Sequence, residues 1–200
     1  MPTEDHHARC PEQTAALDDG CRVPRLAGDG PSRRFELVDG ELRPMPPGRP
    51  THGRIQSNLC RLIGNALIAA GSPCQVVTDP GIITARHPET NMRVPDIGVT
   101  CSPDTPQDRA LPNPLVLIEI LSASNAADTW DNVATYTTIP SVHEIAVVHS
   151  TSIRAELLRR APDGGWPADT DQIAADDTLQ FESIDFACVL RAAYAQTHLA

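Results

Sequence analysis

The clearest pattern along the chain is a stripe of apolar residues at helical spacing that follows residue 50. Thr51 is placed to cap this helix and Gly71 to end it, with apolar residues recurring every three or four positions between them. The stripe consists of Ile55, Leu59, Leu62, Ile63, Ala66, Leu67 and Ala70. His52 and Gln56 lie beside it near the N-terminal end, so we expect both side chains to face the rest of the fold.

Strand patterns lie on both sides of this helix. Residues 34–45, RFELVDGELRPM, alternate around Asp39-Gly40, a dipeptide that favours the tight turn of a β-hairpin. The segment LVLIEIL, residues 115–121, is a nearly continuous apolar run, which is typical of a strand buried on both faces. A second helix is predicted over residues 126–138. The other strand patterns occupy residues 74–84, 93–100, 144–150 and 153–160.

The order of these elements predicts one α/β domain, in which helices flank a mixed central sheet preceded by an N-terminal β-hairpin. This domain is expected to span residues 31–160. Residues 1–30 are rich in Pro, Gly and Asp and show little periodicity, which indicates a flexible arm. Residues 161–200 are expected to form an acidic extension with a short helix over residues 186–195.

Charge is unevenly distributed along the chain. The net charge is −10, but residues 31–160 hold 13 acidic residues against 12 arginines, so the acidity sits in the flanks. This near-neutral centre argues against a strong non-specific binder of nucleic acid, although a local arginine face remains compatible with it. All 16 basic residues are arginines, which excludes mechanisms that need a lysine base, a lysine Schiff base or a P-loop lysine.

The cysteines and the N-terminus indicate a compartment. None of the six cysteines forms a C-x-x-C pair, and the first residues lack the basic start and apolar stretch of a secretory signal. We therefore expect reduced thiols in a cytoplasmic protein. No apolar run approaches the roughly 20 residues of a membrane span, so no membrane partner is expected.

Two carboxylates interrupt apolar strand segments and are the first candidates for chemistry. Glu119 lies within LVLIEIL, where an ionised carboxylate needs a cation, a hydrogen-bond donor or a raised pKa. Asp96 follows Pro95 in VPDIGV. On neighbouring strands, the two could hold Mg²⁺, or Mn²⁺ in its place, with the backbone carbonyl of Ile120 as a further oxygen ligand. Alternatively, Glu119 pairs with an arginine or faces solvent, and Asp96 marks an edge strand or a turn.

Five segments together resemble the Uma-two family of endonucleases, part of the PD-(D/E)XK superfamily to which type II restriction enzymes are related. The segments are RFELVDGEL, THGRIQSNLCRLI, RVPDIGV, PLVLIEILSAS and DTWDNVATYTTIPSVHEIAVV, in matching order over residues 34–160. The resemblance implies a four-stranded mixed core sheet flanked by helices. It also implies Mg²⁺-dependent hydrolysis of phosphodiester bonds, with nucleic acid, most simply DNA, as the substrate.

The resemblance also implies roles for individual residues. Asp96 corresponds to the aspartate of the PD motif, and Glu119 to the acidic residue of the next strand, where ExL replaces ExK. Glu41 in DGEL and His52 at the start of the first helix correspond to polar positions near the pocket. The expected catalytic residues are Asp96, Glu119, Glu41, His52 and Asn132. The expected metal ligands are Asp96, Glu119 and Ile120.

The second helix departs from the family pattern. The family carries D-x-x-x-K-x-x-x-Y there, whereas this chain has Asp128, Asn132 and Tyr136. Asn132 can donate a hydrogen bond but brings no charge to a developing phosphorane. Arg93 and Arg54 are the candidates to supply positive charge instead.

Two functions are compatible with these residues. In the first, the protein is a metal-dependent endonuclease in which Asn132 and His52 assist a metal-bound water. In the second, it is a catalytically degenerate nuclease fold that acts as a binding or assembly module, which the missing lysine favours. A homodimer would match the two strands of a DNA duplex by two-fold symmetry.

Overall fold

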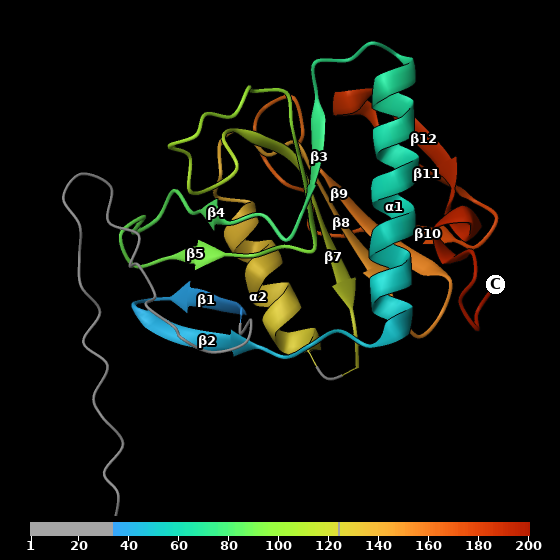
Figure 1. Ribbon diagram of the computed structural model, residues 1–200, viewed down its shortest axis with the longest axis horizontal. Coiled ribbons are helices and arrows are strands. Elements are labelled where there is room, and N and C mark those ends of the chain that lie inside the picture. The colour runs from blue at the N-terminus through green and yellow to red at the C-terminus, as the bar shows by residue number, and fades with distance from the viewer. Residues whose placement is uncertain (1–33, 124) are drawn as a thin grey trace, which may run out of the picture. The chain divides into compact units, whose positions relative to one another are not determined.

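A six-stranded mixed sheet forms the centre of the computed structural model, which describes residues 34–123 and 125–200. The strand order is β10-β9-β8-β7-β6-β3, with β7 and β8 parallel and every other pair antiparallel (Figure 1). The predicted arm, residues 1–30, lies outside the described residues. The strands are β3 (Gln75–Thr78), β6 (Ile97–Thr100), β7 (Pro114–Leu121), β8 (Glu144–His149), β9 (Arg154–Arg159) and β10 (Asp171–Ala174).

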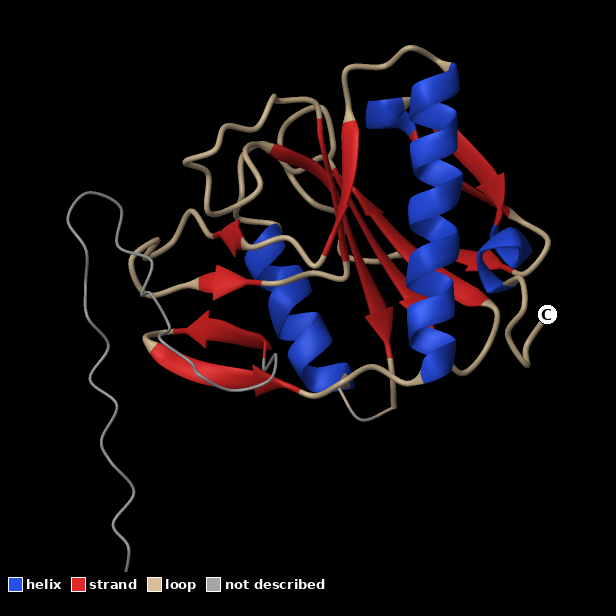
Figure 2. Ribbon diagram, in the orientation of Figure 1, coloured by secondary structure: helices blue, strands red, loops and turns tan. Residues whose placement is uncertain are grey.

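The two predicted helices cover opposite faces of this sheet (Figure 2). Helix α1 (Pro50–Ala69) buries its apolar stripe against one face of β7, which presents Val116, Ile118 and Ile120. Helix α2 (Ala126–Tyr136) packs on the other face, against Leu117. The alternation of side chains along β7 therefore places Glu119, like Leu117, on the α2 side.

The start of α1 differs from the prediction. The N-cap is Arg49, and Pro50 occupies the first turn, so Thr51 is already helical. Proline favours this position because its fixed φ suits a helix start and its missing N–H is not needed there. The hydroxyl of Thr51 instead lies 3.2 Å from His198 Nδ1. No helix in the described ranges has the length and apolar character to cross a membrane.

A second sheet of four strands, in the order β2-β1-β5-β4, contains the predicted hairpin. Its turn residues Asp39 and Gly40 both have positive φ, as the two-residue hairpin turn requires. The continuous strands predicted over residues 74–84 and 93–100 are each broken at a proline, Pro80 or Pro95, which cannot donate to a ladder. The strands of this sheet are β1 (Arg34–Val38), β2 (Glu41–Met45), β4 (Ile82–Ile83) and β5 (Met92–Arg93).

The C-terminal segment completes the same fold. Strand β10 pairs with β9 and adds a sixth strand to the five that precede it, where the resemblance implied a core of four. Residues on both sides of position 160 belong to one compact unit. The expected helix over residues 186–195 is a strand, β12 (Phe186–Val189), followed by a 3-10 helix, Leu190–Tyr194. The cause is pairing of β12 with β11 (Thr178–Phe181), where the rings of Phe181 and Phe186 stack at 5.9 Å. A second 3-10 helix, Glu182–Ile184, joins these two strands.

Arg160 and Trp166 fasten the C-terminal end of α2. Arg160 donates hydrogen bonds to the carbonyls of Val142, Thr137 and Ile139, at 2.8, 3.2 and 2.7 Å. Trp166 Nε1 donates to the same Thr137 carbonyl at 3.0 Å, and the Arg160 guanidinium lies 4.9 Å from the centre of its ring. The Thr137 carbonyl belongs to the C-cap of α2, and those of Ile139 and Val142 to the segment after it, so these bonds fix the position of the helix end.

The prediction of reduced thiols is wrong for Cys74 and Cys101, which form a disulfide bond. Antiparallel pairing of β3 with β6 places Gln75 opposite Thr100, so the adjoining cysteines meet at the end of the ladder. Cys60 and Cys188 are free thiols.

Candidate functional site

Asp96 lies where the chain passes from β5 into β6, directly after Pro95. Its Oδ2 accepts a hydrogen bond from the backbone N–H of Ile120 on β7, at 2.6 Å. Its Oδ1 lies 2.8 Å from Nε2 of His52 in the first turns of α1. The carboxylate is thus held between a central strand and a helix, and His52 faces into the fold as expected.

Polar contacts also fix the backbone beneath Asp96. Gln56 Nε2 donates to the Asp96 carbonyl at 2.8 Å and to Asp79 Oδ1 at 3.0 Å. The N–H of Asp79 donates to the same Asp96 carbonyl at 3.0 Å, and Arg34 pairs with the Asp79 carboxylate. These contacts join the two connecting segments that follow β3 and β5, and so hold Asp96 at the junction of the two sheets.

Glu119 points from β7 toward α2 and is 6% exposed. Its Oε1 accepts hydrogen bonds from the hydroxyl of Tyr136 at 2.7 Å and from Asn132 Nδ2 at 3.5 Å. Burial, followed by the negative charge of Asp96, raises the pKa of Glu119 well above its ordinary value. The structure therefore brings Glu119, Asp96 and Asn132 together, as the sequence predicted.

A third carboxylate, Glu36 of β1, was missed by the sequence analysis. It is 4% exposed, and its Oε1 accepts hydrogen bonds from Asn132 Nδ2 and from the Val94 N–H, both at 3.0 Å. Burial raises the pKa of Glu36. By contrast, the expected Glu41 is exposed on β2, because β2 is the edge strand and β1 the inner one. The available signal was a glutamate between Phe35 and Leu37 in an apolar strand.

The polar residues spaced four apart along α2, Asp128, Asn132 and Tyr136, do not all face the carboxylates. Asn132 bonds both Glu36 and Glu119, and Tyr136 bonds Glu119, whereas Asp128 is exposed and pairs with Arg43 at 3.0 Å. The Asn132 carbonyl oxygen is buried without a hydrogen-bond partner in the described part of the chain. Such an unsatisfied acceptor costs about 1–3 kcal/mol.

Of the two arginines considered as cations, only Arg93 lies near a carboxylate of the site, that of Glu36. It is 3% exposed and donates to the Leu37 carbonyl at 2.8 Å and to Asn91 Oδ1 at 3.1 Å. Its charge partly offsets the effect of burial on the pKa of Glu36. Arg54 is exposed on the outer face of α1.

The donor set fits a hard divalent cation. Glu119 on β7 and Asp96, directly before the adjacent β6, offer carboxylate oxygens, and their mutual repulsion is the kind that a cation relieves. The carbonyl of Ile120 points to the same edge of β7 as its N–H, which contacts Asp96. Within residues 34–123 and 125–200, no group of three or more His, Cys, Asp or Glu side chains is arranged to enclose a metal. Mg²⁺ needs only one or two carboxylates, because waters and phosphate oxygens complete its shell.

The raised pKa of Glu119 predicts that the metal-free protein loses stability as pH rises. From pH 4.5, the ordinary value, up to the raised value, the folded state binds more protons than the unfolded state, so the free energy of unfolding falls with pH. Burial lowers the pKa of His52, but Asp96 and Asp79 outweigh it and raise it above 6.5. The stabilisation from His52 is fully present below pH 6.5 and is lost as the pH rises through its raised pKa. His52 therefore changes the free energy of unfolding in the same direction as Glu119.

Calorimetric melting in EDTA, stepped upward from pH 4.5, measures this dependence. We expect Tm to fall with pH in the wild type and to fall less steeply in Glu119→Gln, because glutamine does not titrate. His52 and Glu36 keep their contributions in that variant. Equal slopes in the two proteins would contradict the assignment to Glu119.

Three comparisons place the chain among known proteins. Residues 21–185 match the model of the Uma2 family, described as "Putative restriction endonuclease". A Synechocystis protein, "Uncharacterized protein slr1290", is 29% identical over 153 residues, 76% of this chain and 78% of that protein. A crystal structure of "a putative nuclease belonging to DUF820" from Anabaena variabilis has a TM-score of 0.65 at 16% identity, covering 80% of this chain and 89% of that one.

These matches bear differently on the predictions. The crystal structure confirms the predicted fold class, a mixed central sheet with flanking helices and an N-terminal hairpin, and at its identity it shows the fold alone. The family match confirms the resemblance drawn from the five sequence segments. Because it spans well over half of the chain, the protein belongs to the Uma2 family of restriction-endonuclease-like proteins.

Proposed function

We propose that this protein is a metal-dependent endonuclease that hydrolyses phosphodiester bonds of DNA. Asp96 and Glu119 would hold Mg²⁺, or Mn²⁺ as a substitute, with the Ile120 carbonyl as a third protein oxygen. The observation that carries the proposal is the pair of buried carboxylates, Glu119 on β7 and Asp96 directly before the adjacent β6, with Asp96 hydrogen-bonded to the residue that follows Glu119. When bound, the cation supplies a lowered pKa for water and neutralises charge on the phosphate.

The chain's own residues position these carboxylates. His52 and the Ile120 N–H hold the two oxygens of Asp96, so its plane is fixed before any ligand arrives. Tyr136 holds one oxygen of Glu119. Such fixed orientation reduces the reorganisation needed during reaction, which is the general basis of electrostatic catalysis.

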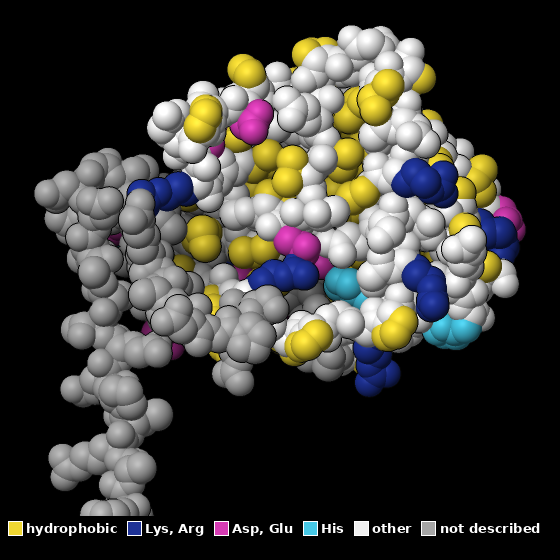
Figure 3. Space-filling model, in the orientation of Figure 1, with side chains coloured by type: hydrophobic (Ala, Val, Ile, Leu, Met, Phe, Trp, Pro, Cys, Tyr) yellow, Lys and Arg dark blue, Asp and Glu magenta, His cyan; other side chains and the backbone are white. Residues whose placement is uncertain are grey.

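Binding of nucleic acid would depend on local groups rather than on a broad basic surface. Side chains of both signs are interspersed with apolar ones on the face seen in Figure 3. This agrees with the near balance of acids and arginines over residues 31–160. A homodimer, if formed, would present two sites to the two strands of a duplex.

A calorimetric titration with Mn²⁺ tests the proposed metal site without knowledge of the substrate. We expect the wild type to bind Mn²⁺ and Glu119→Ala to bind it at least about tenfold more weakly, because loss of even an outer-shell partner commonly has that effect. The matched control is Glu89→Ala, which removes an exposed glutamate from the β4–β5 loop and should leave binding unchanged. Equal binding by the wild type and Glu119→Ala would place the metal elsewhere.

Absence of Mn²⁺ binding by the wild type would favour a second function, a binding or assembly module that retains the nuclease fold. The observation that favours this alternative is Asn132, an amide at the position where the family pattern has a lysine. An amide offers a hydrogen bond but no positive charge to a phosphate in the transition state. Metal binding without hydrolysis would indicate a structural site.

A further inference from the structure

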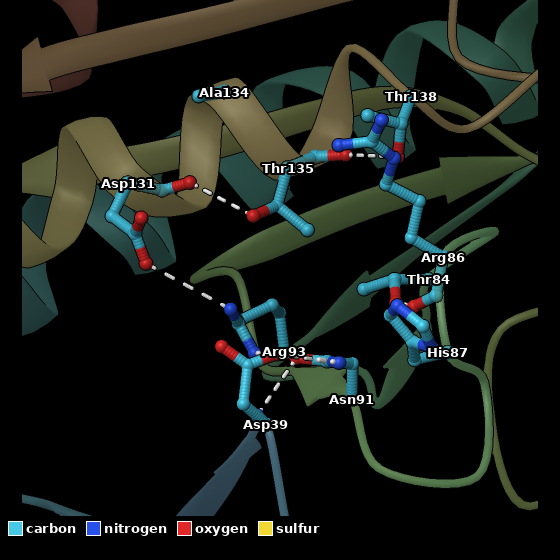
Figure 4. A pocket seen from close by; sticks show the side chains of 10 residues that line it. All are labelled: Asp39, Thr84, Arg86, His87, Asn91, Arg93, Asp131, Ala134, Thr135 and Thr138. Atoms are coloured by element: carbon cyan, nitrogen blue, oxygen red, sulfur yellow. Dashed lines mark hydrogen bonds and ion pairs between the residues drawn. The ribbon is translucent and has the colours of Figure 1, made fainter.

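A cavity of about 580 Å³ lies between the four-stranded sheet and α2, and none of the proposed metal ligands lines it. It is lined by the β1–β2 turn, the β4–β5 loop, β5 and the outer face of α2 (Figure 4). Its volume falls within the range of small-molecule sites in proteins. Arg93 forms part of its wall and also offsets part of the rise that burial causes in the pKa of Glu36, so this buried cation links the cavity to one carboxylate of the site.

The charge of Arg93 is incompletely balanced. Its buried Nε has no hydrogen-bond partner in the described part of the chain, and Nη1 donates to two neutral groups, the Leu37 carbonyl and Asn91. The carboxylate of Asp131 lies beside it, with Oδ2 3.8 Å from Nη2, too far for a hydrogen bond. A buried guanidinium without a hydrogen-bonded anion is costly, and bidentate oxyanions are its preferred partners.

A second arginine stands at the same cavity. Arg86 reaches from the β4–β5 loop toward Thr138, which follows the C-cap of α2, across the cavity from Arg93 (Figure 4). Its guanidinium is exposed and makes no hydrogen bond or ion pair with residues 34–123 or 125–200. The next residue, His87, has a φ of 50°, and its carbonyl accepts the Thr90 N–H at 2.9 Å, which holds the loop in a tight turn.

We propose that this cavity is a subsite for a phosphate group, held between Arg93 and Arg86. The space exceeds that of a phosphate alone, so the group belongs to a larger molecule. One source is a phosphodiester of a DNA strand that also reaches Asp96 and Glu119, and this version rests on the proposed function. The other source is a free nucleotide. Asp131 opposes the anion, because its side chain is 56% exposed beside Arg93 and repels phosphate.

The test measures ligand binding in EDTA, which removes the divalent cations that could recruit phosphate to the carboxylates. The probes are deoxyadenosine 5′-monophosphate, followed by calorimetry, and a labelled DNA duplex, followed by fluorescence anisotropy. We expect Arg86→Ala to weaken binding about tenfold, since it removes a charge-assisted contact. Asp131→Asn should strengthen binding about threefold, because it removes a partly screened repulsion. Arg61→Ala, which removes an exposed arginine of α1, is the matched control and should change neither value.

The two probes separate the sources. If Arg86→Ala weakens DNA binding and lowers the slope of log affinity against log salt by about 1, the phosphate belongs to a strand. If only the mononucleotide is affected, the ligand is free. The proposal is overturned if neither probe binds the wild type, or if Arg86→Ala and Arg61→Ala behave alike. None of these outcomes depends on the Mn²⁺ titration, so failure of the subsite and failure of the metal site are distinguishable.

Discussion

Replacing Asp96 by asparagine is expected to lower kcat for Mg²⁺-dependent DNA hydrolysis by about 10³-fold or more, the upper end of what a single preorganised electrostatic contact provides. Asparagine keeps an oxygen that can accept the Ile120 N–H, so the strand contact at 2.6 Å can survive. What is lost is the negative charge that would hold the cation. Initial rates at saturating DNA measure the effect.

The control for this prediction is Asp104→Asn, which changes an exposed aspartate in the loop after β6 and should leave kcat unchanged. Melting of Asp96→Asn within a few degrees of the wild type would show that the loss is chemical. Retention of most of the activity by Asp96→Asn, at unchanged Mg²⁺ dependence, would remove Asp96 from the proposed metal site.

Asn132→Lys is expected to raise kcat by about 10²–10³-fold, because it restores the cation that the family pattern carries on this helix. The Asn132 amide nitrogen lies 3.0 Å from Glu36 Oε1 and 3.5 Å from Glu119 Oε1, so an ammonium group here would enter a cluster of carboxylates. The exchange also removes the buried, unpartnered carbonyl oxygen of Asn132. The charge would lower the pKa of Glu119 toward its ordinary value.

Asn132→Met is the matched variant, because a methionine side chain is similar in length to lysine and carries no charge. We expect it to leave kcat at or below the wild-type value. If the lysine and methionine variants have equal rates, the charge at this position does not limit the reaction. A wild type without Mg²⁺-dependent hydrolysis, together with an active Asn132→Lys, would identify the chain as a degenerate nuclease that one substitution restores.

The parts of the fold that the sequence predicted well are those with an unambiguous period. Helix α1 and the Asp39-Gly40 hairpin follow directly from spacing and turn chemistry. The breaks at Pro80 and Pro95 were signalled by proline, but pairing between distant strands decides which sheet each half joins. The β11–β12 pair could not be predicted for a different reason, which is that a short apolar run suits a strand or a helix equally.

The candidate site was predicted where a carboxylate interrupts an apolar strand, as Glu119 and Asp96 do. Glu36 meets the same criterion, but the hairpin segment DGEL predicted Glu41 as the site residue instead. Telling them apart requires knowing that β5 pairs with β1 and leaves β2 at the edge. The disulfide could not be predicted either, because Cys101 lies 27 positions after Cys74 and only the β3–β6 register brings them together.

The fastening of α2 by Arg160 and Trp166 has a consequence for the order in which the chain is made. During synthesis the N-terminal parts emerge first, at roughly 5–20 residues per second. The carboxylates and the whole of α2 leave the ribosome before the two side chains that anchor the helix end. All the proposed metal ligands of a nascent chain therefore emerge before Arg160 and Trp166 can hold α2 in the position where Asn132 and Tyr136 contact Glu119. Activity would be gained late, as a property of the finished protein.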